Sequence, residues 1–110
     1  MLNKNNTDRS YLFGRLLAIH VYTALRADPD DSRVLRLRDK YVAHPRTTFV
    51  KIETEVMPDM YPKLSDTLYG KVMDAKADII AALESNGYND DPLTEAYLPG
   101  YKRQRTAIKA

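Results

Sequence analysis

The stretch YLFGRLLAIHVYTALRA, Tyr11 to Ala27, carries the strongest helical pattern in the chain. Apolar side chains recur in it every three or four residues, and a second apolar row lies beside the first. A helix with such a broad apolar face is expected to be largely buried. The first row consists of Leu12, Leu16, Ile19 and Leu25, and the second of Phe13, Leu17, Val21 and Ala24.

Polar residues mark the expected ends of this helix. Thr7 or Asp8 can cap its start, and the turn-forming sequence RADPDD ends it. Asp31 or Ser32 then caps a second helix, which is expected to reach about Ala43.

Prolines and a glycine delimit the next two helices. Pro45 can begin a third segment that runs to about Lys63, and Pro58 inside it should kink it or cut it short. The fourth helix is expected to start near Ser65 and to end at Gly87, because glycine suits a left-handed C-cap.

A fifth helix is expected to begin at Pro92, and Pro99-Gly100 should distort its middle. Its apolar stripe favours packing of its two tyrosines against the bundle over stacking on nucleic-acid bases, although the pattern alone leaves both open. One face carries Tyr97, Tyr101, Gln104 and Ile108, and another carries Lys102, Arg105 and Lys109.

The fold class follows from these five segments. No stretch shows the alternation of a strand, and there is no internal repeat or low-complexity tract. At 110 residues the chain is expected to form one domain, residues 1–110. We predict an all-α bundle of about five helices.

The composition narrows the class of protein. It is 44% hydrophobic and 29% charged, as in a folded globular protein. The absence of cysteine excludes disulfides and thiolate metal sites and fits a reducing compartment. No apolar run reaches the length of a membrane span, and the polar start MLNKNNTD lacks the pattern of a signal peptide, so we expect none. We therefore expect a cytoplasmic protein without a membrane partner.

The charges are segregated although the net charge is only +2. Residues 33–51 contain six Lys or Arg and one acid, whereas residues 53–95 contain three Lys and ten acids. Residues 102–109 contain four cations and no acid. Two basic blocks therefore flank an acidic middle, which creates a local field despite the small total.

The sequence offers no catalytic constellation. His20 and His44 lack the spacing of a zinc site, and they are interpreted as a partly buried imidazole and a helix-end residue. Asp74 and Asp78 lie four residues apart, but lysines such as Lys76 nearby favour a solvated charged face. The four glycines are scattered and form no phosphate-binding loop. We expect no enzymatic activity, no cofactor and no metal.

The basic blocks predict contact with a nucleic-acid backbone. Their cations can pair with phosphates but provide no base readout, so the contact would lack sequence preference. Two alternatives stay open: a solvated charged face, and a protein-only interaction module whose basic patches dock on acidic neighbours. The residues expected to contact nucleic acid are Arg33, Arg36, Lys40, Arg46, Lys102, Arg103 and Arg105.

The motifs YLFGRLLA, HPRTTFVKI and PLTEAYLPGYKRQRTAI lie at the start, the middle and the end of the chain. They resemble the C-terminal region of the large subunit of the type I-C CRISPR Cascade complex. YLFGRLLA, residues 11–18, is similar to its YLLGRLFA segment, and HPRTTFVKI falls at its P-x-x-x-F, here Pro45 and Phe49. PLTEAYLPGYKRQRTAI, residues 92–108, is similar to its closing LS-x-E-x-Q-x-x-F-x-x-GYYHQR. The matching residues of the closing motif are Leu93, Glu95, Gly100, Tyr101, Gln104 and Arg105.

The chain departs from that family in its last motif. Lys102 and Arg103 stand where tyrosine and histidine are common, and Pro99 precedes the glycine. The substitutions make this segment more basic, in agreement with nucleic-acid contact.

The resemblance implies a function. In type I-C systems the C-terminal region is also made separately, by internal translation initiation, as the small subunit of the surveillance complex. This chain resembles that product, since it begins just before the first motif and stops just after the last. The implied partners are the Cascade backbone subunits, the large subunit and further copies of the chain. The resemblance further implies that it stabilises the R-loop of crRNA and target DNA, holding the displaced strand or supporting the guide–target duplex, without catalysis.

Overall fold

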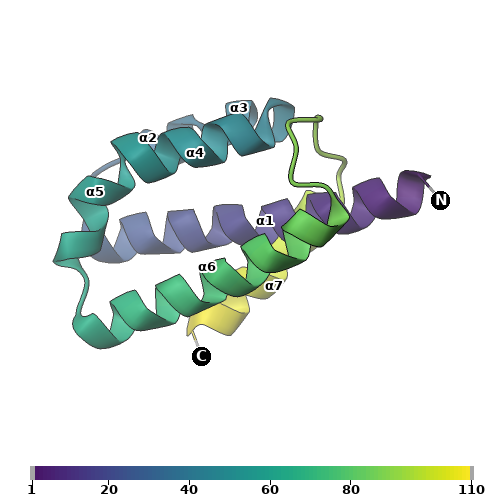
Figure 1. The fold of residues 1–110 in the computed structure, drawn as a ribbon. Coiled ribbons are helices and arrows are strands. Elements are labelled where there is room, and N and C mark those ends of the chain that lie inside the picture. The colour runs from purple at the N-terminus through teal and green to yellow at the C-terminus, as the bar shows by residue number, and fades with distance from the viewer. Residues whose placement is uncertain (1, 110) are drawn as a thin grey trace.

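The computed structural model describes residues 2–109, leaving aside the side chains of residues 2–7, 86 and 109. Within that range every regular element is helical, which confirms the predicted all-α bundle (Figure 1). The elements are α1 (Leu2–Ala27), α2 (Arg33–Arg36), α3 (Arg38–Ala43), α4 (Pro45–Glu55), α5 (Met57–Met60), the 3-10 helix η1 (Tyr61–Lys63), α6 (Asp66–Asn86) and α7 (Tyr97–Lys109).

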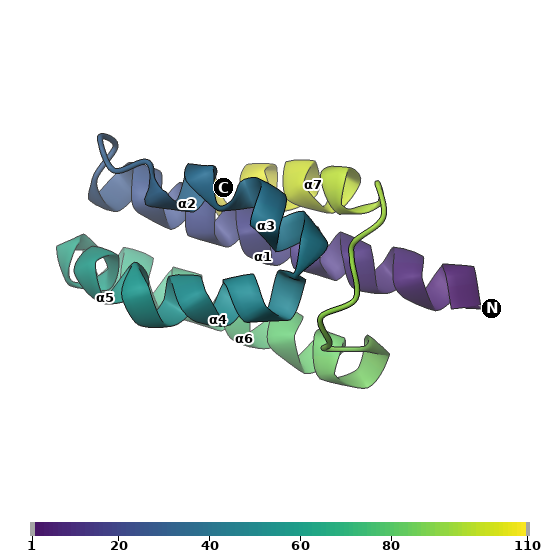
Figure 2. The ribbon, with the colours of Figure 1, turned by 90° about the horizontal axis from the view of Figure 1, so that it is seen from above.

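Helix α1 is the central element of the bundle. In both views it lies between α4 and α7, and α6 runs alongside it (Figures 1 and 2). Its two apolar rows supply much of the core, as the sequence predicted, with one exception. Leu25 is 52% exposed. The buried row continues from Ile19 to Thr23, four residues on, whereas Leu25 is six residues on and falls on another face.

The start of α1 was predicted wrongly. The helix begins at Leu2, so Thr7 and Asp8 lie inside it, and the Thr7 side chain is outside the described residues. A side chain that can cap a helix permits a start at that position but does not require one. No Pro or Gly in the preceding residues stops the helix from extending.

The expected second helix is split. Leu37 separates α2 from α3, and its N–H donates to the carbonyl oxygen of Val34, three residues back, at 3.1 Å. This tighter turn changes the direction of the chain before α3 begins. The start was predicted correctly, because Oδ1 of Asp31 accepts from the backbone N–H of Arg33 at 2.9 Å.

The other helix boundaries in the middle of the chain agree with the predictions. Pro45 is the first residue of α4, and the segment around Pro58 is cut into α4, α5 and η1. Oγ of Ser65 accepts from the N–H of Leu68 at 3.2 Å and caps α6. Gly87 ends α6 with φ of 109°, the left-handed region that glycine tolerates.

The last helix begins later than predicted, at Tyr97 and not at Pro92. Residues 88–96 instead form a connection that Arg9 and Ser10 hold against α1. The Arg9 guanidinium donates to the carbonyl oxygens of Asn89 and Asp91, and Oγ of Ser10 accepts from the N–H of Thr94 at 2.9 Å. These bonds to irregular backbone replace the ones that a helix would make.

Pro99 and Gly100 do not distort the middle of α7, because they lie in its first turn. A proline there removes no helical hydrogen bond, since the first four N–H groups of a helix have no partner within it.

Two glycines allow α1 and α7 to meet backbone to backbone. A Cβ atom added at Gly14 would lie 2.0 Å from the carbonyl oxygen of Tyr97, and one added at Gly100 would lie 2.0 Å from that of Tyr11. Each glycine thus faces a backbone carbonyl of the other helix, and any larger residue would push the helices apart.

A partly buried polar cluster joins α1, α4, η1 and α6 on the other side of the bundle. Its centre is the Glu53 carboxylate, with which Nε2 of His20 pairs at 2.6 Å and to which the Tyr61 hydroxyl donates at 2.8 Å. Nζ of Lys76 donates to Glu53 at 2.6 Å and to the Tyr61 hydroxyl oxygen at 2.9 Å. His20 is fully buried and its ring stacks on Phe49 with centroids 5.0 Å apart.

The cluster fixes the protonation of its members. Burial lowers the pKa of His20, so the imidazole is neutral near pH 7 and its Nε2–H donates to the carboxylate. Burial alone would raise the pKa of Glu53, but hydrogen bonds from His20 and Lys76 lower it to about 2. The prediction of a solvated charged face is therefore wrong for Lys76, whose side chain is only 13% exposed.

Candidate nucleic-acid interface

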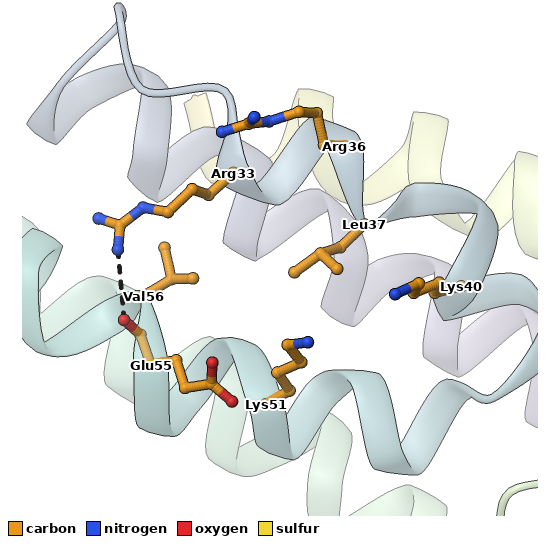
Figure 3. A pocket seen from close by; sticks show the side chains of 7 residues that line it. All are labelled: Arg33, Arg36, Leu37, Lys40, Lys51, Glu55 and Val56. Atoms are coloured by element: carbon orange, nitrogen blue, oxygen red, sulfur yellow. Dashed lines mark hydrogen bonds between the residues drawn. The ribbon is translucent and has the colours of Figure 1, made fainter.

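The three cations predicted on the second helix meet the third segment across a groove. The groove has a volume of about 400 Å³ and is open along one face of the molecule (Figure 3). We call it the basic groove. It is lined by Arg33, Arg36, Leu37, Lys40, Lys51, Glu55 and Val56.

One end of the basic groove is electrically balanced. The Arg33 guanidinium pairs with Asp31 at 2.7 Å and with Asp59 at 3.0 Å, and it donates to the backbone carbonyl oxygen of Glu55 at 3.3 Å (Figure 3). The hydrogen bonds from Arg33 hold the pKa of the Asp31 carboxyl below its usual range. Arg33 is therefore a structural cation that ties α2 to α5, and most of its charge is compensated before any ligand arrives.

The other end of the basic groove carries uncompensated charge. Lys40 and Lys51 project towards each other from opposite walls there (Figure 3). Both are exposed, and no acid within the described part of the chain forms an ion pair with either. Arg36 is exposed as well and runs along the rim towards the Arg33 end (Figure 3).

Sequence reasoning missed Lys51 as a member of this site. It belongs to the same basic block as Arg36 and Lys40, but helical spacing cannot relate it to them, because it lies on α4 and not on α2 or α3. The six-to-one excess of cations in residues 33–51 was the one signal that included it.

The structure places Arg46 outside the basic groove. It lies in the first turn of α4 and is exposed. Its neighbour along the chain, Thr47, donates two hydrogen bonds to the carboxylate of Asp90, at 2.9 and 2.8 Å. These bonds, with the nearby charges of His44 and Arg46, lower the pKa of Asp90. A phosphate near Arg46 would therefore also meet a carboxylate.

The cations of α7 form a separate surface. Lys102, Arg103 and Arg105 are all exposed, as predicted, and the Lys109 side chain lies outside the described residues. The Arg105 guanidinium lies 5.9 Å from the centre of the Tyr101 ring. Because α1 lies between α4 and α7, the structure does not bring these cations together with the basic groove (Figure 2).

The tyrosines of α7 are both partly buried and pack against the core, in agreement with the favoured interpretation of their spacing. The Tyr97 carbonyl faces Gly14, and one row of the helix continues to Gln104 and Ile108, which are both buried. Oε1 of Gln104 accepts from Nε of Arg15 at 2.9 Å. The tyrosines thus anchor α7, and the exposed cations are what it offers to a partner.

Several residues that carry the sequence resemblance are structural. Gly14 and Arg15, from the first motif, contact Tyr97 and Gln104, and Gly100, from the last motif, contacts Tyr11. The first and last motifs are therefore the two halves of one helix–helix interface. They identify the fold without identifying a site.

Metal binding has little support within the described residues. No group of three or more His, Asp or Glu side chains there could hold a metal ion. None of the helices in that part of the chain is both long and apolar enough to cross a membrane.

These features define a helical module with two exposed cationic surfaces, the basic groove and the outer face of α7. The chain belongs to the family described as CRISPR-associated protein (Cas_Csd1), whose family model matches residues 1–109. No curated protein and no solved structure matches it.

Proposed function

We propose that this chain is the non-catalytic small subunit of a crRNA-guided type I-C surveillance complex and works in the cytoplasm, where such a complex meets foreign DNA. It would stabilise the R-loop through contacts with nucleic-acid backbone, on the displaced DNA strand or on the guide–target duplex. It would also bridge the Cascade backbone subunits, the large subunit and further copies of itself. Membership of the CRISPR-associated family and the match over residues 1–109 support this proposal.

The observation that carries the nucleic-acid part is the set of exposed cations without acidic partners. Arg36, Lys40 and Lys51 occupy one groove, and only Glu55 among its lining residues is acidic. R-loop formation exchanges one duplex for another at nearly equal free energy in the related case of a single-protein effector. A few phosphate contacts can therefore decide whether the R-loop persists.

The physical chemistry of the site predicts its salt dependence. The plot of log K against log salt has a negative slope. Removing one phosphate contact makes this slope less steep, by about 0.7 for a single strand and by about 0.9 for a duplex. Contacts of this kind position the protein along the strand without reading its sequence.

The test is a titration of nucleic acid with charge-reversal variants. We expect Arg36→Glu/Lys40→Glu to weaken binding and to reduce the salt slope by about 1 to 2. Lys63→Glu/Lys71→Glu changes the net charge equally at exposed positions outside the basic groove and should behave more like the wild type.

Crosslinking separates this proposal from a protein-only module, for which salt dependence is a poor criterion. An iodouracil-substituted strand should crosslink to this chain within the loaded complex. A chain that assembles with its neighbours but never crosslinks to the strand would be a protein-only module.

A further inference from the structure

The basic groove is not uniform along its length. Leu37 and Val56 point into its middle from opposite walls, and Lys40 and Lys51 stand together at one end (Figure 3). The other end holds the compensated Arg33 and the backbone carbonyl oxygen of Glu55, whose carboxylate extends along α4 towards Lys51 (Figure 3). A surface that only followed a phosphate backbone would not need an apolar floor between its cations.

We propose that the basic groove seats one unpaired nucleotide, with its phosphate between Lys40 and Lys51 and its base on the floor of Leu37 and Val56. This inference rests on the proposed function and makes it more specific, since it selects single-stranded over double-stranded nucleic acid at this site.

The charges set the direction in which the nucleotide lies. The two lysines attract the phosphate to their end of the groove. The other end attracts the phosphate less, because Arg33 there is already paired with Asp31 and Asp59. The uncharged base is the part of a nucleotide that can occupy the apolar middle of the groove.

The size and shape of the groove favour a single strand. Its volume of about 400 Å³ falls in the lower part of the range of about 300–1,000 Å³ that small-molecule sites occupy. In a duplex the bases are stacked inside, so only the sugar–phosphate backbone could face the apolar floor. An unpaired base has free faces and can leave the strand to cover Leu37 and Val56.

The floor predicts little discrimination between bases. Aliphatic side chains give apolar contact to any base and offer no hydrogen-bonding pattern. A deoxyribonucleotide and a ribonucleotide share the phosphate and the base that the groove would hold. The binding measurements therefore use both an oligothymidylate and an oligouridylate.

The test compares two leucine variants of the full chain by fluorescence anisotropy at low salt. Leu37→Asn removes the more exposed of the two floor residues, since Val56 is largely buried, and should weaken binding of a labelled oligothymidylate, an oligouridylate or both by about fivefold. Binding of a duplex with the same number of phosphates should be unchanged. Leu35→Asn is the matched control, because Leu35 lies on α2, is 52% exposed and does not line the groove.

A second measurement needs no variant and so does not depend on how well Leu37→Asn folds. Crosslinks from an iodouracil base to the wild-type chain should map to the peptides that contain Leu37 or Val56. Crosslinks confined to α7 would overturn the proposal that the basic groove seats a nucleotide, which we call the nucleotide seat.

The outcomes separate the two proposals. If the wild-type chain binds neither single strands nor duplex, alone or within the loaded complex, the proposed function fails and the seat fails with it. If it binds both and the two leucine variants behave alike, the proposed function stands and the seat is wrong. Competition by an acidic peptide at equal charge, as effective as that by the oligonucleotide, would assign the groove to a protein ligand and also overturn the seat.

Discussion

Replacing Gly14 by alanine should destabilise the protein although alanine is the better helix former. The new methyl carbon would lie 2.0 Å from the carbonyl oxygen of Tyr97, so α1 and α7 would have to separate by roughly 1–1.5 Å to restore van der Waals contact. Overpacking of this kind costs about 1–3 kcal/mol, and a backbone carbonyl cannot move aside by changing rotamer. We expect the upper part of that range.

The net effect includes the helix propensity of the new residue. Alanine gains about 0.5–1 kcal/mol over glycine in a helix interior, which leaves a net loss of about 2 kcal/mol for Gly14→Ala. For a chain of this length such a loss lowers Tm by about 8 °C. Thermal and urea unfolding followed by far-ultraviolet circular dichroism measure both quantities.

The structure offers a matched control for this substitution. Gly70 lies inside α6, and a Cβ atom added there would meet no atom within 4 Å apart from its chain neighbours and the backbone of its own helix. Gly70→Ala should therefore raise Tm by about 2–4 °C. The reasoning would be refuted if Gly14→Ala stabilised the protein as Gly70→Ala does. A combined Gly14→Ala/Gly100→Ala variant should lose less than the sum of its two parts, because the same two helices separate only once.

Three further predictions concern the polar cluster and the groove. Glu53→Gln leaves Lys76 without its anion and should lower the free energy of unfolding by about 2–4 kcal/mol, measured by urea titration; an unchanged midpoint would contradict the cluster. Stability should also fall on acidification, below about pH 6.5 through His20 and then from about 4.5 towards 2 through Glu53, because both groups have lowered pKa values in the folded state and the unfolded chain binds more protons. Urea midpoints across this range test it, and a midpoint that rose towards acid pH would contradict it. Arg33→Gln should weaken nucleic-acid binding less than Lys40→Gln in the same titration, since Arg33 is already paired with two acids; equal losses would contradict that assignment.

Local sequence signals predicted the elements that depend on local chemistry. The cap at Ser65, the left-handed Gly87 and the helix start at Pro45 each need one residue type at one position, so the sequence alone was enough. The late start of α7 could not be predicted in this way. It depends on Arg9 and Ser10, whose hydrogen bonds to residues 88–96 span 80 and 84 positions of the chain.

The candidate site was predicted in part for the same reason. Helical spacing placed Arg36 and Lys40 on one face, and composition pointed to a basic block, but neither could bring Lys51 across from α4. The spacing also could not show that Arg33 would be compensated by Asp59, which belongs to the acidic middle of the chain. Tertiary contacts decide which cations of a basic block remain available.

The measurement that tests the central claim most directly is target double-stranded DNA binding by a crRNA-loaded type I-C complex with and without this chain. We predict that affinity collapses without it, returns when the wild-type chain is added back, and does not return with Arg36→Glu/Lys40→Glu. Unchanged binding in its absence, with no co-purification of the chain, would contradict the account.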